Sequence, residues 1–207
     1  RFWTASQANF YSSLLFNKDK VFDHEHIPHV DMESLPCFTP VLSVLHDAGL
    51  LNFCTDIVDW NEELILQFYA TLHITGNAED VNSWVLDWMT ENTHFKAPAS
   101  ELLHALPVSP PLEGARCIYH EPELTDHYMQ VLMKPLKPGQ APRTKFLVKE
   151  LLYVPRTVYR ILTKTLSPIK GHDSNEEEVV GIMKNLLFNI IHGVPVNYHD
   201  FFMRTLA

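Results

Sequence analysis

The sequence predicts a mainly α-helical protein, a single multi-helix domain over residues 1–207 with one small β-hairpin. Apolar residues recur at steps of three and four along most of the chain, which is the spacing of one helix face. Only the stretch between Trp84 and Lys96 alternates with period two. A chain of 207 residues can bury a sizeable core, and we expect residues 1–58 to form an N-terminal subregion.

Caps and helix breakers place the helices of the N-terminal half. Thr4 is expected to cap a first helix. The apolar side of that helix is expected to consist of Phe10, Leu14 and Leu15. Thr39-Pro40 combines a hydroxyl N-cap with Pro at the first helical position, and Gly49 should end this second helix in the left-handed conformation.

A third helix and the hairpin follow. Asp59 or Asn61 should open the helix. Its expected buried face consists of Leu64, Ile65, Phe68, Tyr69 and Leu72. The alternating, aromatic stretch after Trp84 predicts a strand, and Glu91-Asn92 predicts a turn into a second strand.

The middle of the chain predicts two helices and a linker. Residues 99–106 should form a helix that stops before Pro107, and residues 123–133 should form another. The inward side of the second helix is expected to consist of Leu124, Tyr128, Val131 and Leu132. The Pro-containing run over residues 134–142 is typical of a linker.

Three helices are expected in the C-terminal part. An apolar stripe over residues 145–164 predicts a helix that is kinked or broken at Pro155, which lacks an N–H donor. Residues 174–192 should form the central core helix, with Leu186 and Leu187 buried and Gly193 as its stop. Ser174 and Glu177 match a capping box, and Asn197 should cap a last short helix.

Charge is unevenly distributed along the chain. The net charge is -9, but residues 1–133 carry -14, residues 134–170 carry +8 and residues 171–207 carry -3. The overall acidity argues against a simple nucleic-acid binder, and the basic segment is the one part that favours it. No apolar run is long enough to span a membrane, and the three cysteines share no CxxC spacing, so a reducing compartment inside the cell, nucleus or cytoplasm, is expected.

Residues 60–206 resemble a family, the plant transposon protein domain found in open reading frames of plant LTR retroelements. Its motifs are helix ends and turns, and the matching segments are Gln67 to Leu72 (QFYATL), His94 to Lys96, Leu102 to Pro107, Lys149 to Val154, Thr165 to Pro168 and Glu177 to Asn197. Ala105 stands where the family has Gly, and Ile169 to Gly171 interrupt the stretch before His172. The resemblance implies a retroelement-derived plant protein with a role in assembly or interaction, and it supplies no catalytic residue.

Sites for a metal ion or a reaction are poorly supported by residue spacing. His24, His26 and His29 are candidate ligands, but Pro28 stands where an HExxH pattern needs its second His, so a solvated loop is favoured and no cofactor is expected. A metal-dependent nuclease would need converging carboxylates. The candidates for it are Asp56, Asp59, Glu62 and Asp87. The sequence contains no GxSxG, P-loop or GxGxxG motif, so no small-molecule substrate is identified and an enzyme is not favoured.

Two surface features remain. A basic stripe at steps of four and seven along the expected helix over residues 145–164 could follow a phosphate backbone, or could pair with the acidic half of the chain. The stripe consists of Lys145, Lys149, Arg156, Arg160 and Lys164. Trp84 and Trp88 could form an interaction patch or pack in the hairpin core.

The sequence therefore favours a non-enzymatic protein-interaction or assembly module that binds a protein partner or a second copy of itself. The alternative is a nucleic-acid-binding module that uses the basic segment. A metal-dependent nuclease or transposase-like enzyme comes third.

Overall fold

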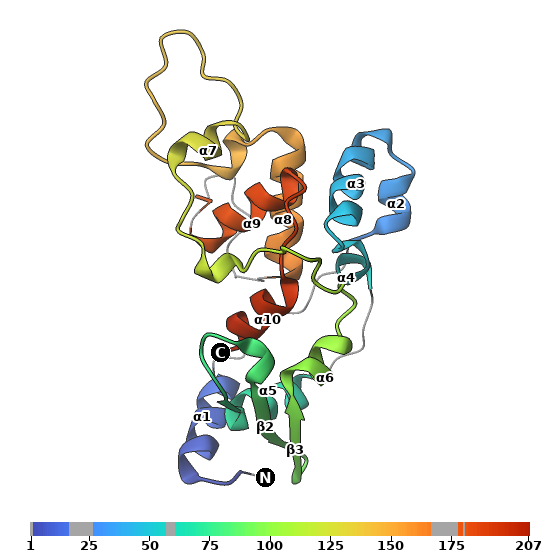
Figure 1. The fold of residues 1–207 in the computed structure, drawn as a ribbon, viewed down its shortest axis with the longest axis vertical. Coiled ribbons are helices and arrows are strands. Elements are labelled where there is room, and N and C mark those ends of the chain that lie inside the picture. Colours follow the sequence, from blue (N-terminus) through green and yellow to red (C-terminus); the bar gives the residue numbers. More distant parts are fainter. Residues whose placement is uncertain (1, 17–26, 57–60, 167–177, 180) are drawn as a thin grey trace. The chain divides into compact units, whose positions relative to one another are not determined.

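A computed structural model describes residues 2–16, 27–56, 61–166, 178–179 and 181–207. Helices predominate, and the sheet is a small antiparallel one, as expected (Figure 1). The chain divides into two compact units, and the single domain over residues 1–207 stays a prediction. Unit 1 comprises Arg1–Phe22, Ile57–Pro107 and Phe202–Ala207, and unit 2 comprises Asp23–Asp56 and Val108–Phe201.

Unit 1 begins with helix α1 (Ala5–Phe16), whose cap is the predicted one. The backbone N–H of Gln7 donates to Thr4 Oγ1 at 3.2 Å, and Gln7 Oε1 accepts from the N–H of Thr4 at 3.1 Å. The predicted apolar side is partly wrong, because Tyr11 is the buried residue of α1 while Phe10 and Leu15 are exposed. The Tyr11 hydroxyl donates to Glu63 of the neighbouring helix, so that contact sets the face that α1 turns inward.

Helix α5 (Glu62–Thr71) is capped by Asn61, whose side chain accepts from the N–H of Leu64 at 3.2 Å. Asp59, the other predicted cap, lies outside the described residues. The predicted buried face is rotated from the observed one, which consists of Leu66, Gln67, Ala70 and Thr71. Two of these, Gln67 and Thr71, are polar, and their side chains hydrogen-bond to the backbone of the hairpin. Gln67 Oε1 accepts from the N–H of Glu91 at 2.8 Å, and Thr71 Oγ1 accepts from the N–H of Met89 at 2.9 Å.

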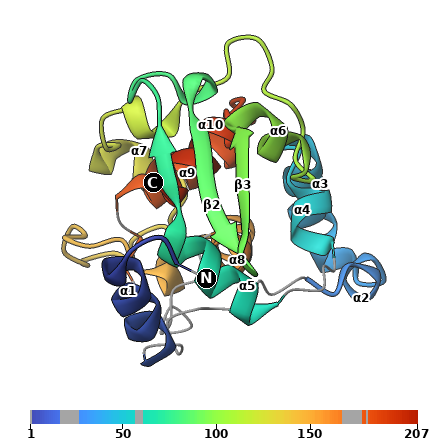
Figure 2. The ribbon, with the colours of Figure 1, turned by 90° about the horizontal axis from the view of Figure 1, so that it is seen from below.

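The predicted hairpin consists of β2 (Val85–Thr90) and β3 (Thr93–Pro98). Glu91 and Asn92 form its turn with φ values of 49° and 63°, a left-handed pair that matches the twist of a two-residue hairpin. The chain adds a third strand that the sequence did not reveal, β1 (His73–Thr75), antiparallel to β2. Figure 2 shows the strands side by side, with α5 near the turn end of β2.

One side of this sheet carries the core of unit 1. Cross-strand partners there are Ile74 with Leu86, and Trp88 with Phe95. The buried residues of the core are Val81, Trp84, Leu86, Ala99 and Met203. They come from the segment before β2, from β2 itself, from α6 (Ala99–His104) and from α10 (Tyr198–Leu206).

Unit 2 is built from short helices around three longer ones. The short helices are α2 (His29–Glu33), α4 (Leu51–Thr55) and α7 (Asp126–Gln130), and the longer ones that pack together are α3 (Thr39–Asp47), α8 (Tyr153–Thr165) and α9 (Ile182–Ile191). Gly49 ends α3 at φ 72° and Gly193 follows α9 at φ 65°, as predicted. Asn197 caps α10 by accepting from the N–H of Asp200 at 3.0 Å, also as predicted.

Two predicted helices of unit 2 differ from the observed ones. The helix expected over residues 123–133 is only α7, so Tyr128 and Val131 are exposed while Leu132 is buried. The helix expected over residues 145–164 begins at Tyr153, after a 3-10 turn over Val148–Glu150. Pro155 therefore lies in the first turn, where a missing N–H costs no helical hydrogen bond and no kink follows.

The predicted central helix is confirmed over α9, but it begins later than expected, because Glu178 forms a β-bridge with Leu147 and Gly181 adopts φ 53°. Leu186 and Leu187 of α9 are both 0% exposed. The expected capping box at Ser174 and Glu177 lies outside the described residues.

The polar side of α9 holds the segment that precedes α7. Asn185 Oδ1 accepts from the N–H of Leu124 at 2.9 Å, and Asn185 Nδ2 donates to the carbonyl of Pro122 at 3.0 Å. Lys184 Nζ lies 2.8 Å from Glu123 Oε1, and this contact lowers the pKa of the Glu123 carboxyl. The buried Asn185 side chain thus provides hydrogen-bond partners for two backbone groups of a segment outside regular secondary structure.

We expect Asn185→Ala to lower the free energy of unfolding by about 1–3 kcal/mol, because two backbone groups lose hydrogen bonds to a buried, part-shielded side chain. Chemical denaturation of the variant measures this loss. The exposed Asn52→Ala in α4 is the control and should change stability by less than about 0.5 kcal/mol. Equal effects of the two substitutions would contradict this role of Asn185.

Candidate functional site

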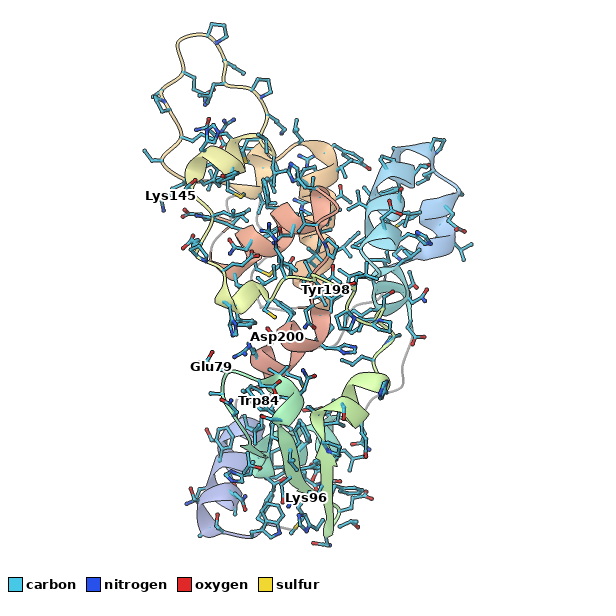
Figure 3. All side chains as sticks on the ribbon, in the orientation of Figure 1. Glu79, Trp84, Lys96, Lys145, Tyr198 and Asp200 are labelled. Carbon is cyan, nitrogen blue, oxygen red and sulfur yellow. The ribbon has the colours of Figure 1, made fainter. Side chains whose placement is uncertain are left out.

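The predicted basic stripe is not one helix face. Lys145 and Lys149 precede α8, and only Arg156, Arg160 and Lys164 lie on it, at steps of four residues. Lys145, labelled in Figure 3, places its Nζ 3.4 Å from Glu178 Oε2. The structure thus separates the stripe into a helical part and a part before the helix.

The helical part of the stripe borders a small hollow of about 340 Å³ in unit 2. Arg160 and Lys164 line one side of it. The other lining residues are Pro28, Asp31, Met32, Leu35, Phe38, Thr157 and Ile161. Asp31 also lines the hollow, so its charged side chains are of both signs.

The two candidate tryptophans pack inside unit 1. Trp84 is 7% exposed, and its Nε1 donates to the carbonyl of Asn77 at 2.7 Å. The Trp88 ring stacks on Phe95 at 5.4 Å between centroids and meets Phe68 edge-on at 5.6 Å. Both tryptophans thus pack in the core of unit 1, which is the alternative to an interaction patch that the sequence left open.

Most of the candidate metal ligands lie outside the described residues. His24 and His26 lie outside the described residues, and so does the side chain of His29, whose backbone begins α2. Among described residues, no group of three His, Cys, Asp or Glu side chains is placed to hold a metal ion. Of the candidate nuclease carboxylates, Asp87 lies 2.6 Å from His94 Nε2 on the sheet, and Asp56 follows the end of α4 in unit 2.

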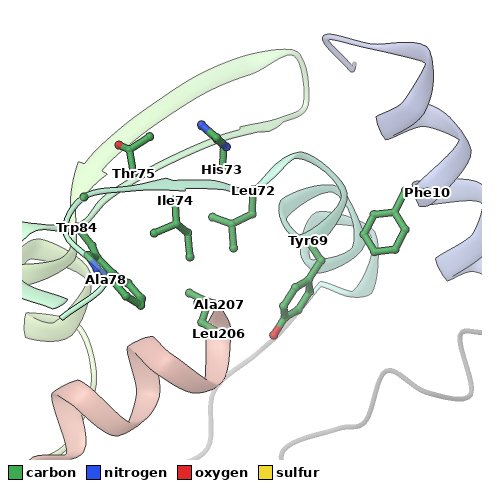
Figure 4. Close-up of a pocket in the computed structure, with 11 residues that line it drawn as sticks. Phe10, Tyr69, Leu72, His73, Ile74, Thr75, Ala78, Trp84, Leu206 and Ala207 are labelled. Atoms are coloured by element: carbon green, nitrogen blue, oxygen red, sulfur yellow. The ribbon is translucent and has the colours of Figure 1, made fainter. Parts of the chain in front are cut away.

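Unit 1 contains a larger hollow, which we call the β1 groove, with a volume of about 570 Å³. It is lined by Phe10, Tyr69, Leu72, His73, Ile74, Thr75, Gly76, Ala78, Trp84, Leu206 and Ala207. Figure 4 shows Leu72, Ile74 and Trp84 pointing from the strand side toward Leu206, while Tyr69 and Phe10 stand at the far end. The side chains that point into the hollow are mainly apolar, and they come from three helices, from β1 and from the segment between β1 and β2.

Local sequence explains how β1 comes to border this groove. Helix α5 ends at Thr71, and Leu72 turns the chain directly into β1 with φ -55° and ψ 127°. At the other end Gly76 adopts φ 142°, a conformation open to Gly alone. A Cβ built on Gly76 would meet the Ser83 carbonyl oxygen at 2.7 Å and Trp84 Cα at 2.9 Å. The absence of a side chain lets this loop pass over the tryptophan that lines the groove.

Arg204 holds the same loop to α10. Its Nη1 donates to the carbonyl of Ala78 at 3.0 Å, and its Nη2 donates to that of Glu79 at 3.3 Å. The guanidinium also lies over the Trp84 ring, 5.9 Å from the centroid. This wall of the groove is therefore fixed by hydrogen bonds and packing, so the loop would lose little conformational entropy when a ligand binds.

Two aromatic side chains of the groove are half exposed: Phe10 is 50% exposed and Tyr69 is 48% exposed. Partial burial raises the pKa of the Tyr69 hydroxyl, so it stays a neutral hydrogen-bond donor at physiological pH. Aromatic rings with one polar tip are the side chains most enriched in protein interfaces.

Sequence reasoning missed this site for two reasons. It assigned Tyr69 to a buried helix face, and it read no strand after Leu72. The available signal was the run His73-Ile74-Thr75 before Gly76, which has two β-branched residues directly after a helix stop.

Comparison with models of protein families, with curated proteins and with solved structures found no match. None of the helices in the described parts of the chain is long and apolar enough to cross a membrane.

Proposed function

We propose that the chain is a non-enzymatic protein-interaction module whose β1 groove receives a segment of a partner protein. The observation that carries this is an apolar hollow with two half-exposed aromatic rings, set against the edge strand of a sheet. Exposed apolar surface with a polar rim is typical of interaction sites. The family resemblance supports the same role, that of a retroelement-derived plant protein that acts in assembly inside the cell.

The lining of the groove suits apolar side chains of a partner protein better than a small polar substrate. Among the polar lining residues the side chains of His73 and Thr75 point away from the groove and Tyr69 supplies a hydroxyl, without the convergent charged groups that fix a small polar substrate. Apolar side chains of a partner would instead gain free energy by leaving water, at roughly 25 cal/mol for each Å² buried. Tyr69 is expected to contribute most, because tyrosine in a desolvated interface is a frequent hot spot.

The test is a selection of peptides from an unbiased displayed library on the full chain. We expect peptides that bind the wild type and lose at least tenfold in affinity on Tyr69→Ala, since a hot-spot truncation costs about 2 kcal/mol. The matched control is Tyr128→Ala in unit 2, an equally exposed tyrosine at 50%. Enriched peptides whose affinity is the same for both variants would contradict the proposal.

A second candidate function uses the basic residues of α8, which present Arg156, Arg160 and Lys164 at four-residue spacing. Such a row could follow phosphates, and binding would then weaken steeply with salt. In the segment before α8, Arg143 lies 3.4 Å from Glu150, and such ion pairs favour neutralisation of the basic residues by nearby acids instead.

Replacing Lys149, Arg156 and Arg160 together by Gln separates these two readings. We expect a modest loss of stability, about 0–1 kcal/mol for each exposed pair, and no nucleic-acid phenotype. Fluorescence anisotropy with labelled DNA and RNA at two salt concentrations checks this. Salt-sensitive micromolar binding by the wild type that the triple variant abolishes would establish the nucleic-acid module.

A further inference from the structure

We infer that the segment bound in the β1 groove is an extended strand with a basic residue at one end, which pairs with the open edge of β1. The inference deepens the proposed function and rests on it. It names the conformation and the charge of the partner segment.

The strand order supplies the first argument. β1 is an edge strand, because the sheet runs β1-β2-β3. Among the described residues, the backbone hydrogen bonds of His73–Thr75 reach only β2. An open edge is a template for one more strand, and addition of a strand to such an edge is an established way of binding extended peptides.

The position of the groove supplies the second argument. Side chains alternate along β1, so Ile74 points into the groove while His73 and Thr75 point away from it (Figure 4). A strand added beside β1 would continue the sheet and would place every second side chain on the same face as Ile74. Those side chains would enter the hollow between Tyr69 and Leu206, and a helix could not use the open backbone edge.

Charge supplies the third argument. In the described part of unit 1 the cations are Lys96 and Arg204. The carboxylates are Glu62, Glu63, Glu79, Asp80, Asp87, Glu91 and Glu101. Glu79 is exposed and directly follows Ala78, which lines the groove, and Figure 3 labels it at the outer side of the loop. A partner with Lys or Arg at this end of the strand would complement the carboxylate.

The experiment measures the affinity of the full chain for three synthetic heptapeptides. The first alternates Val and Thr between terminal lysines. The second replaces both lysines by glutamate. The third keeps the lysines but carries N-methyl groups on alternate amides along the edge that would face β1. We expect the first peptide to bind at least tenfold more tightly than the other two, because one loses charge complementarity and the other loses main-chain pairing.

Substitutions in the protein test whether the basic end of the bound peptide lies beside Glu79. Glu79→Gln should weaken binding of the lysine peptide two- to fivefold, as expected for one exposed ion pair, and should not weaken binding of the glutamate peptide, since it removes a repulsive charge. Glu101→Gln in α6, an exposed carboxylate that does not line the groove, should change neither affinity.

Several results would overturn the inference. Equal binding of the N-methylated peptide would exclude strand addition, and tighter binding of the glutamate peptide would exclude the charge assignment. Library peptides that depend on Tyr69 but are helical in the bound state would remove the inference and leave the proposed function standing. A dimer in light scattering that Tyr69→Ala dissolves would identify a second copy of the chain as the occupant and would overturn it too.

Discussion

Leu186→Asp is expected to abolish cooperative folding of unit 2. Leu186 is 0% exposed in the central helix α9, so the substitution removes a packed side chain and places a carboxylate in a position without access to water. The cost should exceed about 4 kcal/mol, a large part of the 5–15 kcal/mol that stabilises an ordinary domain. Loss of the thermal transition in far-ultraviolet circular dichroism, together with aggregation, is the expected result.

The matched control for Leu186→Asp is Leu152→Asp. Leu152 is 41% exposed and occupies the N-cap position of α8, where an aspartate is favourable. This variant should remain soluble and melt cooperatively. A soluble Leu186→Asp protein with an unchanged melting curve would show that α9 is not the central helix of unit 2.

Gly76→Ala should destabilise unit 1 by about 2–6 kcal/mol. The φ of 142° at Gly76 is strained for any other residue, which costs about 1–3 kcal/mol, and the new Cβ would press on backbone atoms of Ser83 and Trp84. Relieving that overlap costs about 1–3 kcal/mol more. All four tryptophans of the sequence fall within unit 1, so denaturation followed by tryptophan fluorescence reports on this unit specifically.

Gly139→Ala separates backbone strain from crowding. Gly139 has a φ of 79°, and a Cβ built there meets nothing within 4 Å, so only the left-handed conformation is penalised, by about 1–2 kcal/mol. If Gly76→Ala destabilised the protein no more than Gly139→Ala, the close approach of this loop to Trp84 would be refuted.

Local signals in the sequence were sufficient where a single residue decides the backbone. The Thr4 and Asn197 caps, the Glu91-Asn92 turn and the stops at Gly49 and Gly193 all follow from side-chain or φ preferences of one or two residues. The helix-dominated fold and the hairpin are predictable from the spacing of apolar residues, at steps of three and four in the helices and of two in the strand.

Predictions that depended on which face an element buries were less successful. The buried face of α5 was misassigned because Gln67 and Thr71 are buried as hydrogen-bond partners of the hairpin, which no hydrophobic pattern reveals. The sequence predicts one helix over residues 145–164 because the apolar spacing continues through residues that form a 3-10 turn in the structure. The β1 groove was missed because it needs an edge strand of only three residues next to two side chains far apart in sequence, Phe10 and Leu206.

Site-specific photo-crosslinking would show whether partner segments bind in the β1 groove. Benzoylphenylalanine would replace Tyr69 in one full-length protein and Tyr128 in another, and each would be irradiated with the library-selected peptide. We expect a covalent adduct at position 69, competed by unlabelled peptide, and none at position 128. An adduct at position 128 alone, or equal adducts at both positions, would contradict it.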